Sequence, residues 1–145
     1  MVDVLTDITI HCPREQVAAY AANPENAPEW YVNIKKAEWQ LNKSVVIGAR
    51  IAFIAQFLGR ELSYVYEIVE YVPGEKMVMR TANGPFPMET TYTWEKIDDQ
   101  TTRMTLRNKG NPTGFSKLFT PFMSTMMKKA NNADLKRIKS MLEKD

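Results

Sequence analysis

Side chains that could carry out acid–base or nucleophilic chemistry are few in this 145-residue sequence. His11 is its single histidine and Cys12 its single cysteine, and the two are adjacent. We expect His11 to face away from Ile8 and Ile10, which places it outside an apolar interior. Cys12 is interpreted as a small buried hydrophobe, the common role of a free cysteine, with a nucleophilic thiol as the alternative.

Metal-binding and catalytic motifs are also missing from the sequence. One histidine and one cysteine cannot complete the usual zinc ligand set, and the carboxylates are not spaced to supply the rest. The chain has no glycine-rich phosphate loop, no nucleophile elbow and no Ser/His pairing. The sequence therefore predicts no metal, no cofactor and no catalytic constellation, and it leaves open whether the protein is an enzyme.

Four charged residues of the strand-rich region could reach an interior site. Apolar alternation turns Arg80, Glu89 and Arg103 outward and leaves Glu70 in phase with Ile68. An inward Glu70 could anchor a ligand hydroxyl, or act as a base if desolvation raised its pKa. The alternative is that Glu70 lies in water at the end of its strand.

Composition and charge exclude several classes of protein. The net charge is +2, from 19 basic and 17 acidic residues, which is too balanced for a nucleic-acid-binding surface. No apolar run approaches the roughly 18 residues that a membrane span needs. The first ten residues lack the basic leader of a signal peptide, and a lone cysteine gives no intramolecular disulfide. These features predict a cytoplasmic protein with a single domain over residues 1–145.

The N-terminal third is predicted to be a strand, a helix and a corner. Val4, Ile8 and Ile10 share one face of the first segment, as in a half-buried strand. Residues 13–22 favour a short helix that begins with a proline. The stretch "NPENAPEWY" at 23–31 holds two prolines and two adjacent aromatics, so it can form at most one further turn.

The remaining chain is predicted to be a run of strands and then one long helix. Between residues 34 and 108, short alternating segments are separated by turn signals such as Gly59-Arg60 and Pro73–Lys76. Such a pattern is typical of an antiparallel meander of about six strands. Thr120-Pro121 begins a helix of about 20 to 25 residues, which would be about 30–37 Å long.

These elements predict an α+β fold in which a curved antiparallel sheet wraps around the long C-terminal helix. A bent sheet that grips one helix tends to leave an apolar space where small molecules bind. The alternative is that the aromatic and methionine side chains simply fill the core. The residues expected to line the cavity are Phe53, Tyr64, Tyr66, Met79, Tyr92 and Trp94 from strands, Phe119, Phe122, Met123, Met126 and Met127 from the helix, and Trp30 and Tyr31 at one end.

The segment "ITIHCPREQVAAYAANPENAPEWYVNIKKAEW" resembles the opening of the START-like superfamily, in its polyketide cyclase/dehydrase and lipid-transport (SRPBCC) branch. Pro13 and Val17 match the family's first helix, and Pro24 and Trp30 match its proline-tryptophan corner. Asn23 stands where the family usually has an aspartate. The later stretches "GARIAF", "YEIVEYVPGEKMVMR" and "NADLKRIKSMLE" also resemble family landmarks, so the resemblance spans nearly the whole chain.

The resemblance implies a helix-grip fold, with two short N-terminal helices and a cavity for lipids, sterols, polyketides, hormones or quinones. It does not imply a reaction, because members range from cyclases to carriers, and fold alone does not fix function. In this fold Trp30 and Tyr31 would form a wall or gate at the end of the cavity. A plug that only closes the core is the alternative for both residues.

The sequence is compatible with three functions. The first is binding or transport of a small hydrophobic molecule in the cavity. The second is a polyketide cyclase or aromatase, which an inward titratable group would favour. The third is a protein-interaction module, which a tightly filled interior would favour.

Overall fold

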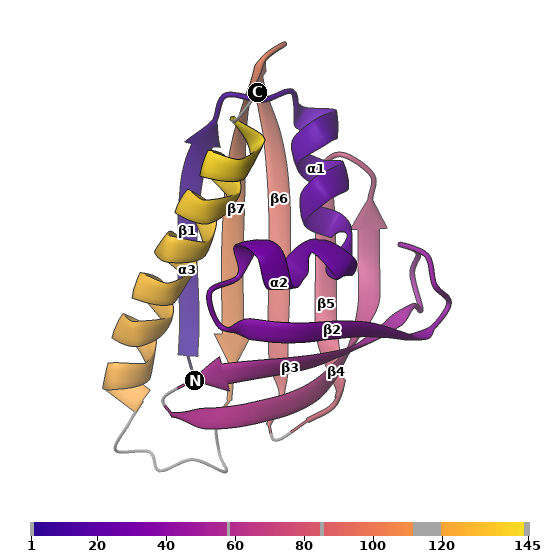
Figure 1. The fold of residues 1–145 in the computed structure, drawn as a ribbon, viewed down its shortest axis with the longest axis vertical. Helices are drawn as coiled ribbons and strands as arrows, with labels where there is room; N and C mark the ends of the chain where they lie inside the picture. Colours follow the sequence, from indigo (N-terminus) through magenta and orange to yellow (C-terminus); the bar gives the residue numbers. More distant parts are fainter. Residues whose placement is uncertain (1, 58, 85, 112–119, 144–145) are drawn as a thin grey trace.

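Seven antiparallel strands form one sheet, and the helices lie on one face of it (Figure 1). The computed structural model describes residues 2–57, 59–84, 86–111 and 120–143. The helical elements are α1 (Arg14–Ala22), the 3-10 turn η1 (Pro24–Asn26), α2 (Ala27–Trp30) and α3 (Thr120–Leu142). The strands are β1 (Val2–Ile10), β2 (Ile34–Leu41), β3 (Arg50–Phe57), β4 (Arg60–Val72), β5 (Lys76–Asn83), β6 (Met88–Asp98) and β7 (Thr101–Gly110).

The strand order β1-β7-β6-β5-β4-β3-β2 places the first two strands at opposite edges of the sheet. Strands β2 to β7 follow one another as a meander, and β1 returns beside β7 with Val2 opposite Gly110 and Ile10 opposite Thr102. The segment α1-η1-α2 therefore crosses from one edge to the other. This architecture confirms the predicted α+β helix-grip fold, with its meander, its short N-terminal helices and its long C-terminal helix.

Two irregularities in the pairing of β4 with β5, one extra residue in each strand, bend the sheet. The pairing of β4 with β5 shifts between Val65 and Tyr66 and again between Ile68 and Glu70. An extra residue in one strand bends it and increases its twist. In Figure 1, β2, β3 and the first part of β4 accordingly run across the direction of β1, β6 and β7, and the end of β4 turns to run alongside β5.

The proline-rich corner seats one tryptophan in the core. The side-chain oxygen of Asn23 accepts a hydrogen bond of 3.0 Å from the backbone N–H of Glu25, so Asn23 caps the turn that follows it. Trp30 is fully buried, and its ring lies 4.2 Å from that of Tyr31 and 5.7 Å from that of Tyr92. The corner thus joins the N-terminal helices to the concave face of the sheet.

The buried face of α3 differs from the one that the sequence predicts. Met123, Leu135 and Ile138 are buried, whereas Phe122 is 67% exposed and Met126 is 45% exposed. The prediction assumed that apolar residues alone would face the sheet. The buried face instead includes two polar residues, Asn131 and Asp134, and the helix is rotated so that Phe122 and Met126 point outward.

We predict that two methionines one turn apart will respond differently to truncation. Met123→Ala should lower the free energy of unfolding by about 2 kcal/mol, because it removes a buried side chain. Met126→Ala, the matched control on the same helix, should change it by less than about 0.5 kcal/mol. Urea denaturation of both variants checks this, and equal losses would contradict the orientation of α3.

Candidate functional site

A cavity of about 130 Å³ lies between the concave face of the sheet and α3. Its wall is mainly aromatic and aliphatic, with side chains from β3, β4, β5, β6, β7 and α3. Eight of the residues predicted from the sequence line it: Tyr31, Phe53, Tyr64, Tyr66, Met79, Tyr92, Met123 and Met127. The structure thus brings together side chains that are up to 96 residues apart in the chain, from Tyr31 to Met127.

The volume is smaller than the roughly 300–1,000 Å³ of common ligand pockets. It is close to the roughly 150 Å³ of a cavity that holds a benzene molecule. Met79, Met88, Met123 and Met127 line the wall, and methionine side chains adapt to different apolar shapes. A guest with one ring fits the cavity as it stands, and a larger one requires these side chains to rearrange.

Four of the predicted cavity residues do not line this space, and a fifth, Phe119, falls outside the described residues. Trp30 and Trp94 are buried beneath the wall, where Trp30 packs on Tyr92 and Trp94 lies 6.0 Å from the ring of Tyr92. Phe122 and Met126 are exposed on the outer side of α3. Glu70, predicted separately as a possible polar anchor, does not line the cavity either.

Glu70 does not serve as the predicted polar anchor. It forms a 3.0 Å ion pair with Lys76 on β5, its side chain is 49% exposed, and it is not part of the cavity wall. The prediction counted strict alternation from Ile68. The register shift between Ile68 and Glu70 breaks that alternation and turns the carboxylate to the solvent.

Tyrosine hydroxyl groups supply part of the polar lining. The hydroxyl oxygens of Tyr31 and Tyr92 lie 2.5 Å apart in a hydrogen bond. Burial raises the pKa of Tyr31 and Tyr92 well above the usual value, and it raises that of Tyr66 to about 12. These phenols therefore remain protonated at neutral pH and can donate hydrogen bonds.

A chain of hydrogen bonds crosses the cavity wall from β4 to α3. The hydroxyl groups of Tyr66 and Thr90 are 2.8 Å apart, and Thr90 Oγ1 donates to Asn108 Oδ1 at 2.6 Å. Asn108 Nδ2 donates in turn to Asn131 Oδ1 at 3.1 Å. All four residues line the cavity, so this polar chain is part of its surface.

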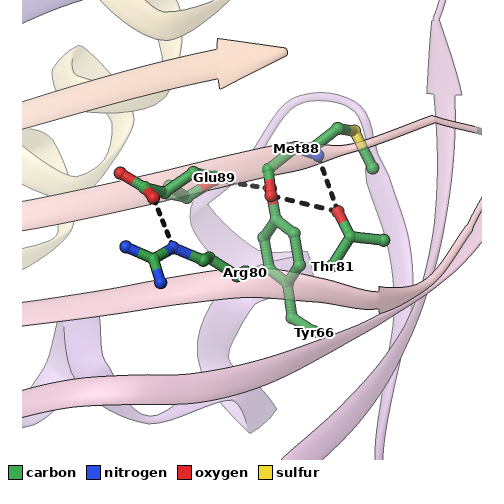
Figure 2. Close-up of polar contacts among 6 residues, drawn as sticks. Tyr66, Arg80, Thr81, Met88 and Glu89 are labelled. Atoms are coloured by element: carbon green, nitrogen blue, oxygen red, sulfur yellow. Dashed lines mark hydrogen bonds and ion pairs between the residues drawn. The ribbon is translucent and has the colours of Figure 1, made fainter. Parts of the chain in front are cut away.

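The contacts around Met88 hold one edge of the wall in place (Figure 2). Thr81 Oγ1 accepts a hydrogen bond of 2.8 Å from the backbone N–H of Met88 and donates one of 3.0 Å to its carbonyl. Next to it, Arg80 and Glu89 form an ion pair of 2.6 Å on the outer face, as their alternation predicts. Strand β6 is thereby fixed to β5 where Met88 reaches the cavity.

Asp134 is the functional candidate that the sequence interpretation missed. Its side chain is 3% exposed, it lines the cavity, and its Oδ1 accepts a hydrogen bond of 2.8 Å from the backbone N–H of Val32. Desolvation raises the pKa of this carboxyl to about 7, against the opposing effects of the Val32 N–H and of Arg137. The available signal was its position, because Asp134 precedes Leu135 and lies one turn before Ile138 in the apolar stripe of α3.

His11 and Cys12 lie away from this site. His11 is exposed, and neither residue is among those that line the cavity. The buried Cys12 thiol donates to Gln16 Oε1 at 3.1 Å, and desolvation, followed by the charge of Glu143, raises its pKa. A raised pKa disfavours the thiolate, so these contacts give no support to a nucleophilic role.

The described residues contain neither a metal-binding cluster nor a membrane-spanning helix. No group of three or more His, Cys, Asp or Glu side chains is arranged there to hold a metal ion. No helix within the same residues has the length and the apolar character to cross a membrane.

Comparison with known proteins places the chain in a family. The sequence model for polyketide cyclase/dehydrase and lipid transport matches residues 1–143, nearly the whole chain. No curated protein matches the sequence.

Solved structures share the fold at low sequence identity. The Zhui aromatase/cyclase from Streptomyces sp. R1128 superposes with a TM-score of 0.82 at 13% identity, over 97% of this chain and 93% of that one. A START superfamily protein from Mycobacterium smegmatis gives 0.79 at 11% identity, over 97% of both chains. The protein TTHA0849 from Thermus thermophilus gives 0.78 at 17% identity, over 97% and 96%. At such identities these structures bear on the fold alone.

The raised pKa of Asp134 leads to a prediction about stability and pH. The carboxyl of Asp134 has a higher pKa in the folded protein, about 7, than in the unfolded chain, 3.8. The folded state therefore becomes less stable as the pH rises from 3.8 to above 7. Asp134→Asn keeps an acceptor for the Val32 N–H and removes the charge. The free energy of unfolding of the variant, relative to the wild type, should therefore increase by about 2 kcal/mol between pH 5 and pH 8.

Urea denaturation of both proteins at the two pH values measures this difference. Glu70→Gln is the control, because it removes a carboxylate from an exposed ion pair and should change stability by less than about 1 kcal/mol. A constant difference between wild type and Asp134→Asn across this pH range would show that the carboxyl is not desolvated.

Proposed function

The chain belongs to the polyketide cyclase/dehydrase and lipid transport family of the START/SRPBCC superfamily, whose members bind hydrophobic ligands, and we propose that it binds and carries a small hydrophobic molecule in the cavity between the sheet and α3. The residues proposed to contact the ligand are Tyr31, Phe53, Tyr64, Tyr66, Met79, Tyr92, Met123 and Met127.

The observation that carries this proposal is a cavity of about 130 Å³ with a mainly apolar wall. Protein interiors are usually close-packed, and few voids in them exceed the size of a water molecule. A space of this size between strands and a helix is destabilising, because its lining side chains lose packing contacts, and a ligand that fills it restores those contacts. The same observation argues against an interaction module with a filled core.

Asp134 supports a second candidate, an enzyme of the cyclase or aromatase kind. A carboxyl with a pKa of about 7 inside an apolar cavity can take up and release a proton near neutral pH. We place this candidate second, because proton transfer also requires a reactive substrate held against Asp134, and the family includes both enzymes and carriers.

The carrier function predicts that protein purified without detergent from its own host carries a guest. Native mass spectrometry should detect a discrete added mass that is lost on denaturation. Ala130→Leu should reduce the occupied fraction severalfold, because Ala130 lines the cavity and a larger side chain fills part of its volume.

Ala133→Leu is the matched control, since Ala133 borders the outer groove of the same helix beside Lys129 and Lys136. It should leave the occupied fraction unchanged. Equal loss in both variants, or a wild-type protein that binds no hydrophobic molecule from host extract, would contradict the proposed function.

A further inference from the structure

One buried donor in the cavity wall lacks a partner. The side chain of Asn131 is 4% exposed, and its Nδ2 has no hydrogen-bond partner among the described residues. A buried N–H without an acceptor is strongly disfavoured. Asn131 is a residue of the cavity wall, and a ligand oxygen that reaches Nδ2 would supply the missing acceptor.

The hydrogen-bond chain fixes the orientation of Asn131. Thr90 has one hydroxyl proton, which it donates to Asn108 Oδ1, so the Tyr66 hydroxyl must donate to Thr90. Asn108 then has only its amide group to offer to Asn131, and Asn131 must receive it with Oδ1. The Nδ2 group of Asn131 is therefore the donor that is left without a partner.

An acceptor lies one helical turn further along the same face of α3. Asp134 follows Asn131 by three residues, a spacing that places side chains about 5–6 Å apart at Cβ. The Val32 N–H occupies Asp134 Oδ1, and an ionised carboxylate can accept several further hydrogen bonds. The mainly apolar wall thus includes, one helical turn apart, a residue with an unpartnered donor and a residue with an acceptor.

We propose that this pair selects a hydrophobic ligand that carries a hydroxyl group, an alcohol or a phenol. Asn131 Nδ2 donates to the hydroxyl oxygen, and the carboxylate of Asp134 accepts the hydroxyl proton. This inference rests on the proposed function and adds the chemical class of the ligand.

Other polar groups match the pair less well. An ammonium group has no lone pair for Asn131 Nδ2, and a carboxylate would be repelled by Asp134. A carbonyl accepts from Asn131 but offers no proton to an ionised Asp134. A hydroxyl oxygen is both acceptor and donor, so one atom serves both side chains.

The charge state of Asp134 makes this selectivity depend on pH. The titratable groups whose charges act on Asp134 or that share the cavity are Tyr31, Tyr64, Tyr66 and Tyr92, with Arg137 on α3 and Lys109 on β7. The four phenols have pKa values raised by burial and stay neutral. The ionised carboxylate strengthens ligand binding above the Asp134 pKa of about 7, and protonation at lower pH weakens it.

The test compares p-cresol with p-xylene, which have nearly the same shape and differ by a hydroxyl in place of a methyl group. Isothermal titration calorimetry of the wild type at about pH 8 should give at least about tenfold tighter binding of p-cresol, the size of one hydrogen bond to a charged group. At about pH 5.5 this advantage should fall at least about threefold, while p-xylene binding stays constant.

Asp134→Asn provides the matched variant, because it keeps the shape of the side chain and an acceptor for the Val32 N–H. It should remove the pH dependence and most of the preference for p-cresol. It should also strengthen binding of 4-methylbenzaldehyde, whose carbonyl can accept from the new amide. A gain for this probe would not follow from a purely structural role of Asp134.

The outcomes separate this inference from the proposed function. Equal affinities for p-cresol and p-xylene would overturn the hydroxyl selectivity and leave hydrophobic binding intact. Failure of both probes to bind would contradict binding in this cavity and the hydroxyl selectivity with it.

Discussion

The bend of the sheet is the constraint on which the rest of the structure depends. A seven-stranded sheet that turns through the irregular pairing of β4 has a concave face too wide for one helix to fill. With 23 residues, α3 is about 35 Å long, but as a single rod it contacts mainly β1. The corner that carries Trp30 covers part of the remaining surface. The cavity lies between the sheet and these two elements, and side chains of both form part of its wall.

The polar residues of the wall follow from this geometry. Asn131 and Asp134 occupy positions of α3 that would face a dry core in a closely packed protein, where an unpaired amide and a carboxylate would be strongly unfavourable. Here the Val32 N–H and the chain from Tyr66 to Asn131 satisfy part of their hydrogen-bonding capacity. The amide nitrogen of Asn131 stays without a partner, and both residues belong to the wall of the cavity. Fold and site thus have a common origin in the shape of the sheet.

Much of this arrangement could be predicted from the sequence, because it depends on local periodicity. Alternation along β3, β4 and β6 identified Phe53, Tyr64, Tyr66 and Tyr92 as inward-facing, and the caps and prolines marked the helices. The predicted inward position of Glu70 was wrong because a bulge changes the alternation of β4. A bulge depends on pairing with another strand, which the sequence of one strand does not show. The predicted orientation of α3 was wrong because apolar periodicity alone does not distinguish the exposed Phe122 and Met126 from the buried Met123. Asp134 was overlooked because its inward position becomes a signal only when the cavity is known.

The solved structures share the fold of this chain but little of its sequence. Structures with 11–17% identity share this fold, so many different sequences can form the same backbone arrangement. What distinguishes one such protein from another must lie in the few side chains that meet the guest. In this chain the apolar wall sets size and shape, and adaptable methionines make that part permissive. Discrimination against the wrong ligand therefore falls to buried polar groups, because leaving them unpaired is far more unfavourable than a poor apolar fit. Asn131 and Asp134 are the pair in the wall that combines a free donor with a titratable acceptor.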